Sequence, residues 1–290
     1  MPFQLIGAPL KLGADIDGLD RSIKAFISYN NCYYSQIQTV TVEVNQDVYT
    51  ANLKHLDPIA KYCEKLAKIT NQLTKKGTFP ITIGGDHTVA LGTIAGVSKD
   101  RKIAVYWIDA HGDFNTEKTT TTGHIHGMPL AALAGFGNTK LVNCFYPGPK
   151  VLLNDIVMFG SRDFDQKEKE LIKENNIAYY PAKHLTYQNI EHALNESYTR
   201  LSDDIDGIHI SLDLDVLDPI ACPGVSVPVP NGFTVKELEV TLRTLFKTGK
   251  VNSIDIVEYN PAFDKNNATA KILDDTIKLV KQLNQKYNED

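Results

Sequence analysis

The stretch that most constrains the fold of this chain is AVYWIDAHGDFNT, which runs from Ala104 to Thr116. Its apolar first half predicts a buried strand, and Asp109, His111 and Asp113 follow that strand directly. In extended backbone, side chains two residues apart point to the same side, so these three polar groups would face one region. They emerge at the C-terminal end of the strand, where open α/β sheets bind their ligands. The stretch therefore predicts a buried strand that ends in a candidate metal site.

Strand and helix patterns alternate along the whole chain, with no linker-like segment and no repeat of fixed period. This alternation predicts an α/β fold with one domain, residues 1–290, in which helices cover both faces of a mostly parallel sheet of about eight strands. A closed (β/α)₈ barrel is the alternative, and it would also place the polar motifs at strand C-termini. The predicted strands are 3–8, 38–44, 79–83, 103–108, 153–160, 177–180, 207–212 and 251–257, and the predicted helices are 21–29, 51–76, 88–97, 128–134, 166–175, 187–202, 234–246 and 266–286.

Composition narrows the class of protein. The 290 residues are 42% hydrophobic and 22% charged, which is typical of a soluble globular chain. The net charge is −5 and no basic cluster occurs, so we expect neither a nucleic-acid partner nor an anionic membrane. The N-terminus does not read as a signal peptide, and no segment reaches the roughly 18 apolar residues of a membrane span. The four cysteines are far apart and are predicted to be free thiols, so we expect a cytoplasmic protein.

Polar residues follow three further predicted strands, namely His87, the pair Asp213 and Asp215, and Glu258. In a parallel sheet these strand ends share one edge, so the residues can converge with Asp109 and its neighbours. Any one of these groups could be an ordinary cap or strand end, but four together argue against that reading. Four aspartates in a small volume require cations, and two divalent ions would balance them, with Asp109 and Asp213 as bridges. Carboxylates with imidazoles and no thiolate favour Mn²⁺, and a metal pair that activates water predicts a hydrolase.

Four motifs resemble those of the ureohydrolases, the family that contains arginase, agmatinase and formimidoylglutamase. They are GGDHTVALG (84–92), DAHGDFNT (109–116), SLDLDVLDP (211–219) and SIDIVEYNP (253–261). The resemblance implies a three-layer α/β/α fold, two Mn²⁺ ions, and attack of hydroxide on an amidine or guanidine carbon. It also implies two ligand sets, which are His87, Asp109, Asp113 and Asp213 for one ion, and Asp109, His111, Asp213 and Asp215 for the other.

The same resemblance implies roles for residues beside the metals. The loop TTTTGHIHGMP is similar to a loop of arginases, and His126 falls at the histidine proposed there as a proton shuttle. An imidazole suits proton transfer near neutral pH. Glu258 falls at the acid that contacts the guanidinium, where a carboxylate can accept paired N–H bonds. The predicted catalytic residues are therefore His126, Glu258 and Asp113.

Residues at the far end of the substrate decide which ureohydrolase this is. Asn115 and Thr122 match positions that hold the α-carboxylate of arginine, and Asp165 matches the position that faces its α-ammonium, although Asp165 also suits the N-cap of a helix. The chain departs from arginases in four places, one of which is that Gly18-Leu19-Asp20 lacks the Gly-Pro that commonly follows the N-terminal loop. Thr122 stands where arginases have a serine, and His124 stands where they have an asparagine. The sequence of the loop 222–232 is more similar to that of formimidoylglutamases. We therefore include His124 among the candidate substrate-binding residues.

These observations predict a binuclear manganese hydrolase that converts L-arginine to L-ornithine and urea. The alternative is a related ureohydrolase for another guanidino or formimino substrate, such as agmatine, formimidoylglutamate or a guanidino acid. A catalytically silent member acting as a binding protein is the rival from another class, and retention of every predicted ligand argues against it. The resemblance also implies a homo-oligomer, a trimer or a hexamer.

Overall fold

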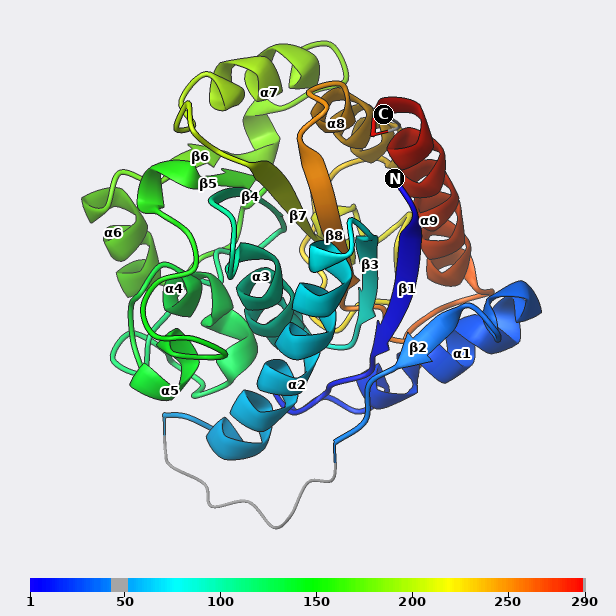
Figure 1. Ribbon diagram of the computed structural model, residues 1–290, viewed down its shortest axis with the longest axis horizontal. Coiled ribbons are helices and arrows are strands. Elements are labelled where there is room, and N and C mark those ends of the chain that lie inside the picture. The colour runs from blue at the N-terminus through cyan, green and yellow to red at the C-terminus, as the bar shows by residue number, and fades with distance from the viewer. Residues whose placement is uncertain (43–51, 289–290) are drawn as a thin grey trace.

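The strands of the described chain belong to one parallel sheet (Figure 1). The computed structural model describes residues 1–42 and 52–288. Within these ranges the sheet has the order β2 (Ile37–Thr39), β1 (Phe3–Ala8), β3 (Phe79–Gly84), β8 (Val251–Val257), β7 (Gly207–Asp213), β4 (Ile103–Ile108), β5 (Ile156–Phe159) and β6 (Ala178–Tyr180). Every neighbouring pair is parallel. Among the described strands β2 and β6 have one neighbour each, so the sheet is open and the barrel alternative is wrong.

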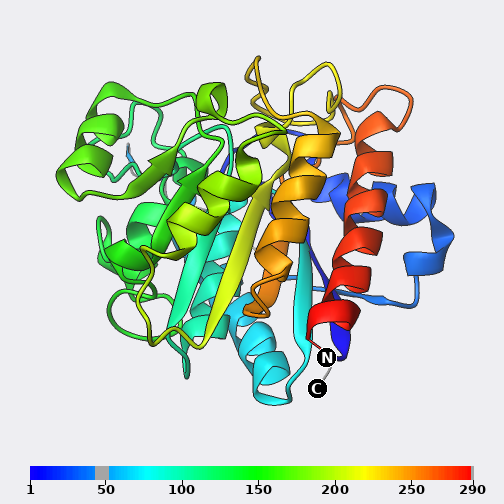
Figure 2. The same cartoon turned by 90° about the horizontal axis from the view of Figure 1, so that it is seen from above.

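Helices cover both faces of this sheet, as predicted. They are α1 (Ser22–Tyr29), α2 (Leu56–Lys75), α3 (Ala90–Ser98), α4 (Pro129–Leu133), α5 (Thr139–Val142), α6 (Gln166–Glu174), α7 (Ile190–Tyr198), α8 (Val235–Phe246) and α9 (Ala268–Tyr287). Side chains of β4 alternate between two cores. Tyr106 and Ile108 pack into the core that contains residues of α7, α8 and α9, whereas Val105 and Trp107 pack into the core that contains residues of α2 and α3. Figure 2 shows α8 (orange) and α9 (red) side by side over one face. None of the helices in residues 1–42 and 52–288 is both long enough and apolar enough to cross a lipid bilayer.

The strand order brings the four polar strand ends together. After β3 the chain passes over two positions of the sheet to form β4, then β5 and β6, and it returns to fill the gap with β7 and β8. The strands β3, β8, β7 and β4 are therefore consecutive neighbours in the middle of the sheet. Eleven of the twelve predicted site residues lie at the ends of these four strands or in the segments that follow them, and Asp165 follows β5, the next neighbour of β4, so one edge of the sheet collects them all.

The structure differs from the predicted elements mainly at the edge of the sheet. The predicted strand 38–44 is observed only as β2, because its partner β1 ends at Ala8 and the last paired residues are Gly7 and Thr39. Residues 43 and 44 of that prediction lie outside the described residues. The predicted helix 51–76 begins at Leu56, after His55 in a left-handed conformation (φ 57°), and residue 51 also lies outside the described part. The four-residue helix α5 was not predicted.

Candidate metal centre

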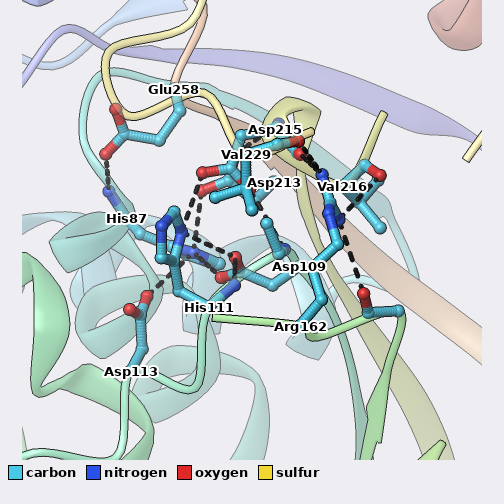
Figure 3. A network of polar contacts seen from close by, with 12 residues as sticks. His87, Asp109, His111, Asp113, Arg162, Asp213, Asp215, Val216, Val229 and Glu258 are labelled. Atoms are coloured by element: carbon cyan, nitrogen blue, oxygen red, sulfur yellow. Dashed lines mark hydrogen bonds and ion pairs between the residues drawn. The ribbon is translucent and has the colours of Figure 1, made fainter. Parts of the chain in front are cut away.

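The end of β4 places Asp109 between two histidine rings. Asp109 is fully buried, and its Oδ2 accepts a hydrogen bond from Trp107 Nε1 (2.9 Å) while its Oδ1 accepts one from the backbone N–H of His111 (2.7 Å). Oδ2 also lies 2.9 Å from Nδ1 of His87, and Oδ1 lies 3.5 Å from Nδ1 of His111. The two oxygens thus face different histidines (Figure 3). This geometry suits a carboxylate that bridges two cations.

His87 reaches the cluster from the turn that follows β3. Gly85 lets this turn pass close to Leu10, since a Cβ on Gly85 would lie 1.8 Å from the Leu10 carbonyl oxygen. The ring of His87 stacks on Trp107 with ring centroids 4.0 Å apart. Its Nε2 lies 2.9 Å from Ser211 Oγ on β7, and its Nδ1 faces the carboxylates. Stacking and the serine contact together orient the ring.

A short chain of hydrogen bonds sets the protonation of His87. Ser211 Oγ donates to Oδ1 of Asp255 (2.6 Å). Burial opposes ionisation of Asp255, but His209 beside it holds the pKa of that carboxyl below its ordinary value, so Asp255 is an acceptor only. Because the single hydroxyl hydrogen of Ser211 is used in this way, Ser211 Oγ accepts from Nε2–H of His87. Nδ1 then faces the carboxylates, which raise the pKa of His87 despite its burial, and a cation held by these carboxylates would take the place of the Nδ1 proton.

Three further carboxylates complete the cluster. Oδ2 of Asp113 and Oδ2 of Asp213 lie 3.1 Å and 3.3 Å from Nδ1 of His87, and Oδ2 of Asp215 lies 2.9 Å from Nδ1 of His111. Burial and the neighbouring carboxylates raise the pKa of Asp113 to about 6, and the same causes raise the pKa of Asp213. The cluster therefore concentrates more negative charge than two histidines can balance.

The atoms left unpaired in this cluster fit bound metal ions. Nδ1 of His87 has no hydrogen-bond partner of good geometry, although three carboxylate oxygens lie within 3.3 Å of it. Two ligand atoms held at right angles by one divalent ion, at about 2.1 Å each, lie about 3.0 Å apart, which matches these separations. The candidate ligand atoms form two groups, and the atoms within each group lie within 4.8 Å of one another. They are His87, Asp109 and Asp213, and Asp109, His111 and Asp215, so Asp109 belongs to both.

The metal-ligand candidates border a cavity of about 380 Å³. Of the twelve site residues predicted from the sequence, Asp109 is fully buried and the other eleven line this cavity. The eleven are His87, His111, Asp113, Asn115, Thr122, His124, His126, Asp165, Asp213, Asp215 and Glu258. The structure thus brings together all the residues that the motifs singled out.

Glu258, directly after β8, offers a free carboxylate oxygen to the cavity. Its backbone is left-handed (φ 64°), a conformation that costs roughly 1–2 kcal/mol for such a residue. Oε1 accepts a hydrogen bond from the backbone N–H of His87 (3.0 Å), whereas Oε2 is buried without a partner. Nδ1 of His126 lies 3.8 Å from Oε1, and although burial lowers the pKa of His126, Glu258 raises it above its ordinary value. This pair can bind a cationic group and hold a proton beside it.

The residues predicted for the far end of a substrate form a second polar group in the cavity. Asn115 Nδ2 donates to Asp165 Oδ2 (3.0 Å). Asp165 is also the N-cap of α6, and its backbone N–H donates to Glu168 (3.1 Å), so its two predicted roles are compatible. Thr122 Oγ1 accepts from the backbone N–H of His124 (3.2 Å). Hydroxyl, amide, imidazole and carboxylate groups therefore surround the cavity beyond the metal ligands.

Two residues that shape the site, Arg162 and Glu168, are not among those predicted from the sequence. Arg162 donates to the backbone oxygens of Asp215 (2.8 Å) and Val229 (2.7 Å), and it thereby ties together the loops that follow β7 (Figure 3). Glu168 borders the cavity and accepts from the backbone N–H of Phe114 (2.8 Å), and burial raises its pKa to about 8. Both belong to the segment SRDFDQKE after β5, where a charged run at a strand end was the available signal.

Known proteins with similar sequences and folds share one family. The model of the Arginase family matches residues 3–280. The arginase of Brevibacillus brevis is 38% identical over 278 residues, which cover 92% of this chain and 93% of that protein. The solved structure of the arginase from Bacillus caldovelox matches with a TM-score of 0.87 at 33% identity, covering 100% of this chain and 99% of that one. The formimidoylglutamase from Bacillus subtilis matches with a TM-score of 0.79 at 20% identity, which is a likeness of fold alone.

Proposed function

Because the chain belongs to the arginase family, we propose that it is a binuclear manganese hydrolase that converts L-arginine to L-ornithine and urea. The observation that carries this proposal is the convergence of four carboxylates and two histidines from the ends of β3, β4 and β7 beside one cavity, next to the unpaired Oε2 of Glu258 at the end of β8. Carboxylates and imidazoles without thiolates suit Mn²⁺.

The candidate ligands would divide into two sets that share Asp109 and Asp213. His87, Asp109, Asp113 and Asp213 would hold one ion, and Asp109, His111, Asp213 and Asp215 would hold the other. The separate contacts of the two Asp109 oxygens with the two histidines support this division. The chemistry supplied by the ion pair would be a hydroxide nucleophile at neutral pH.

The remaining groups would bind and protonate the substrate. Oε2 of Glu258 is free to accept N–H bonds from a planar guanidinium, since Oε1 is already bonded to the His87 backbone. As oxygen adds to the guanidinium carbon, the bond from that carbon to the alkyl-bearing nitrogen breaks, and this nitrogen must gain a proton to leave as the amine of ornithine. His126 would deliver that proton, and its position 3.8 Å from Glu258 supports this role. Asp165 would face the α-ammonium, and Asn115 and Thr122 would bind the α-carboxylate.

A substrate panel tests the proposal. The protein is loaded with Mn²⁺, its metal content is measured, and urea release is followed with L-arginine, agmatine and guanidino acids, together with formamide release from formimidoylglutamate. We expect the highest kcat/KM with L-arginine. A higher value with another compound would favour the alternative ureohydrolase, and no turnover of any compound by the metal-loaded protein would contradict an enzymatic role.

We also propose that residues 1–290 form one ureohydrolase domain, and the single sheet that runs from β1 to β8 supports this. The expected trimer or hexamer and the expected cytoplasmic location rest on the family resemblance and on the composition of the chain. Light scattering on the purified protein and fractionation of the source cells would test them.

A further inference from the structure

Lys54 brings a cation to a loop that forms part of the cavity wall. Its backbone N–H donates to the carbonyl oxygen of Gly123 (3.0 Å), and its Nζ lies 2.7 Å from Nε2 of His124. Thr122 and His124 of this loop border the cavity. Lys54 therefore contacts the wall of the cavity directly, through the residue at which this chain carries histidine in place of the asparagine of arginases.

The contact fixes the roles of both side chains. An ammonium group can only donate, so Nε2 of His124 accepts and the ring hydrogen resides on Nδ1. Burial and the charge of Lys54 both lower the pKa of His124, which agrees with a neutral ring at pH 7. The ammonium of Lys54 keeps two further N–H groups, and no carboxylate in residues 1–42 and 52–288 lies within 4.0 Å of its Nζ.

The cavity is therefore unevenly charged beyond the metal ligands. Glu258 has a free carboxylate oxygen, and Asp165 accepts hydrogen bonds from Asn115 and lines the same cavity. These acids match cationic groups of a substrate. Lys54 supplies a positive charge next to the loop that it contacts, and the hydroxyl of Thr122 belongs to the same loop. A ligand that satisfies all these groups carries a guanidinium, an ammonium and a carboxylate.

We propose that Lys54, together with His124, is a specificity-determining residue that selects guanidino substrates with a carboxylate at the end remote from the guanidinium. The inference rests on the proposed function, because it concerns the substrate of that same site. Lys54 is half-buried, so solvent screens its charge only in part. A ligand that lacks the carboxylate would offer this charge no anionic partner, and a neutral residue at position 54 should remove the difference in affinity between ligands with and without the carboxylate.

The test compares Lys54→Met, Lys54→Arg and the matched control Lys68→Met in the manganese-loaded full chain. Lys68 lies on α2, where it pairs with Glu64 on the exposed surface, so its replacement changes the net charge equally. For each protein, KM and kcat for L-arginine are measured, along with the inhibition constants of L-ornithine and 1,4-diaminobutane, which differ only by the carboxylate.

We expect Lys54→Met to raise KM for L-arginine and the inhibition constant of L-ornithine about 10-fold, the loss typical of one charge-assisted hydrogen bond, with kcat changed less than about 2-fold. The inhibition constant of 1,4-diaminobutane should stay the same or fall. Lys54→Arg should restore most of the L-ornithine affinity, and Lys68→Met should match the wild type. Equal changes for both inhibitors, or none for L-ornithine, would overturn the role of Lys54 while leaving urea release by the wild type, and hence the proposed function, intact. A wild type that releases no urea from L-arginine would overturn both.

Discussion

Two buried clusters of aspartate and histidine meet at the contact between His87 and Ser211. They differ in how completely their polar atoms are hydrogen-bonded. The strand-end cluster comprises the six candidate metal ligands, which are His87, Asp109, His111, Asp113, Asp213 and Asp215. The mid-sheet cluster comprises Thr93, His209, Ser211, Ser253 and Asp255, and Ser211 contacts His87 (2.9 Å). The two clusters use the same acidic and basic residue types, and nearly all of both is buried.

The mid-sheet cluster is balanced in charge and in hydrogen bonds. One aspartate faces one histidine, with Nε2 of His209 2.9 Å from Oδ2 of Asp255. Ser211 donates to the other oxygen, and Ser253 lies 2.8 Å from Nδ1 of His209. The pairing of β7 with β8, which sets Ser211 opposite Asp255 and His209 opposite Ser253, produces these contacts directly. Such a cluster needs no ligand.

The strand-end cluster has four aspartates for two histidines, and Nδ1 of His87 is left without a directed hydrogen bond. Its Asp113 has a pKa raised to about 6 by burial and by Asp109, whereas the pKa of the equally buried Asp255 is lowered by His209 despite burial. Burial and residue type therefore do not identify a metal centre. The ratio of acid to base, and the atoms that the protein leaves unpaired, identify it.

The largest expected effect comes from removing the carboxylate that belongs to both ligand groups. Asp109→Asn should lose bound manganese and activity together, with kcat reduced by three orders of magnitude or more, since bulk water would replace the hydroxide that the ion pair supplies. Metal analysis after gel filtration and the urea assay measure the two losses. The exposed Asp203→Asn serves as the control with the same change of charge. If Asp109→Asn kept both ions and a normal rate, the bridging role would be wrong.

A second prediction sets the same substitution in the two clusters against each other. Asp255→Asn should lower the free energy of unfolding of the metal-free protein by about 3–5 kcal/mol, because it leaves His209 buried without its partner. Asp113→Asn should leave that free energy unchanged or raise it, because one of four like charges disappears. Asn also tolerates the left-handed backbone of position 113 (φ 48°). Denaturant unfolding in a chelator measures both variants.

The order of the two variants in free energy of unfolding should reverse when manganese is added. Metal binding to the native state stabilises it, and Asp113→Asn should lose much of this stabilisation while Asp255→Asn retains more of it. Equal destabilisation of the two metal-free variants would mean that the strand-end cluster is as well satisfied as the mid-sheet cluster, and the case for a cation there would fail.

The strand-end cluster was predictable from the sequence, whereas the mid-sheet cluster was not. Asp109, His111 and Asp113 follow a buried strand at alternate positions, and in a parallel sheet the ends of all strands that carry such residues share one edge. His209 and Asp255 lie inside apolar runs whose pattern predicts strands but no polar cluster. Their contact depends on β7 and β8 being neighbours in a particular register, which local patterns do not contain. The alternation of His209, Ser211 and Asp213 on one face of β7 was the signal available.

The fold was predicted in class, and the errors arose where tertiary contacts decide. Strand β2 is short because β1 ends, a fact about its partner rather than about its own sequence. The positions of β7 and β8 between β3 and β4 follow from the packing of the whole sheet, and alternation of strands and helices could not specify them. Arg162 and Glu168 bind backbone groups of distant segments, so their role too appears only in three dimensions.

The smallest expected effect concerns the residue that joins the two clusters. Ser211→Ala removes the acceptor of the His87 Nε2 hydrogen, and the ring can then adopt the other tautomer or turn. Because outer hydrogen bonds to metal-binding histidines typically change metal affinity 10–100-fold, we expect that loss for the ion that His87 would hold. The ion that His111 would hold should bind nearly as in the wild type. Titration calorimetry with Mn²⁺ should resolve one weakened site and one retained site.

Ser253→Ala is the matched control, since it removes a hydroxyl from the far side of His209 and lies one further contact from His87. It should cost stability, about 1 kcal/mol for one buried hydrogen bond, without changing either metal affinity. If Ser211→Ala lowered the affinity for both ions equally, the serine would support the sheet as a whole. Unchanged affinity for both would mean that stacking on Trp107 alone orients the ring. If Ser211→Ala lowered the affinity for only one ion, the mid-sheet cluster would be shown to hold a ligand of the strand-end cluster in place.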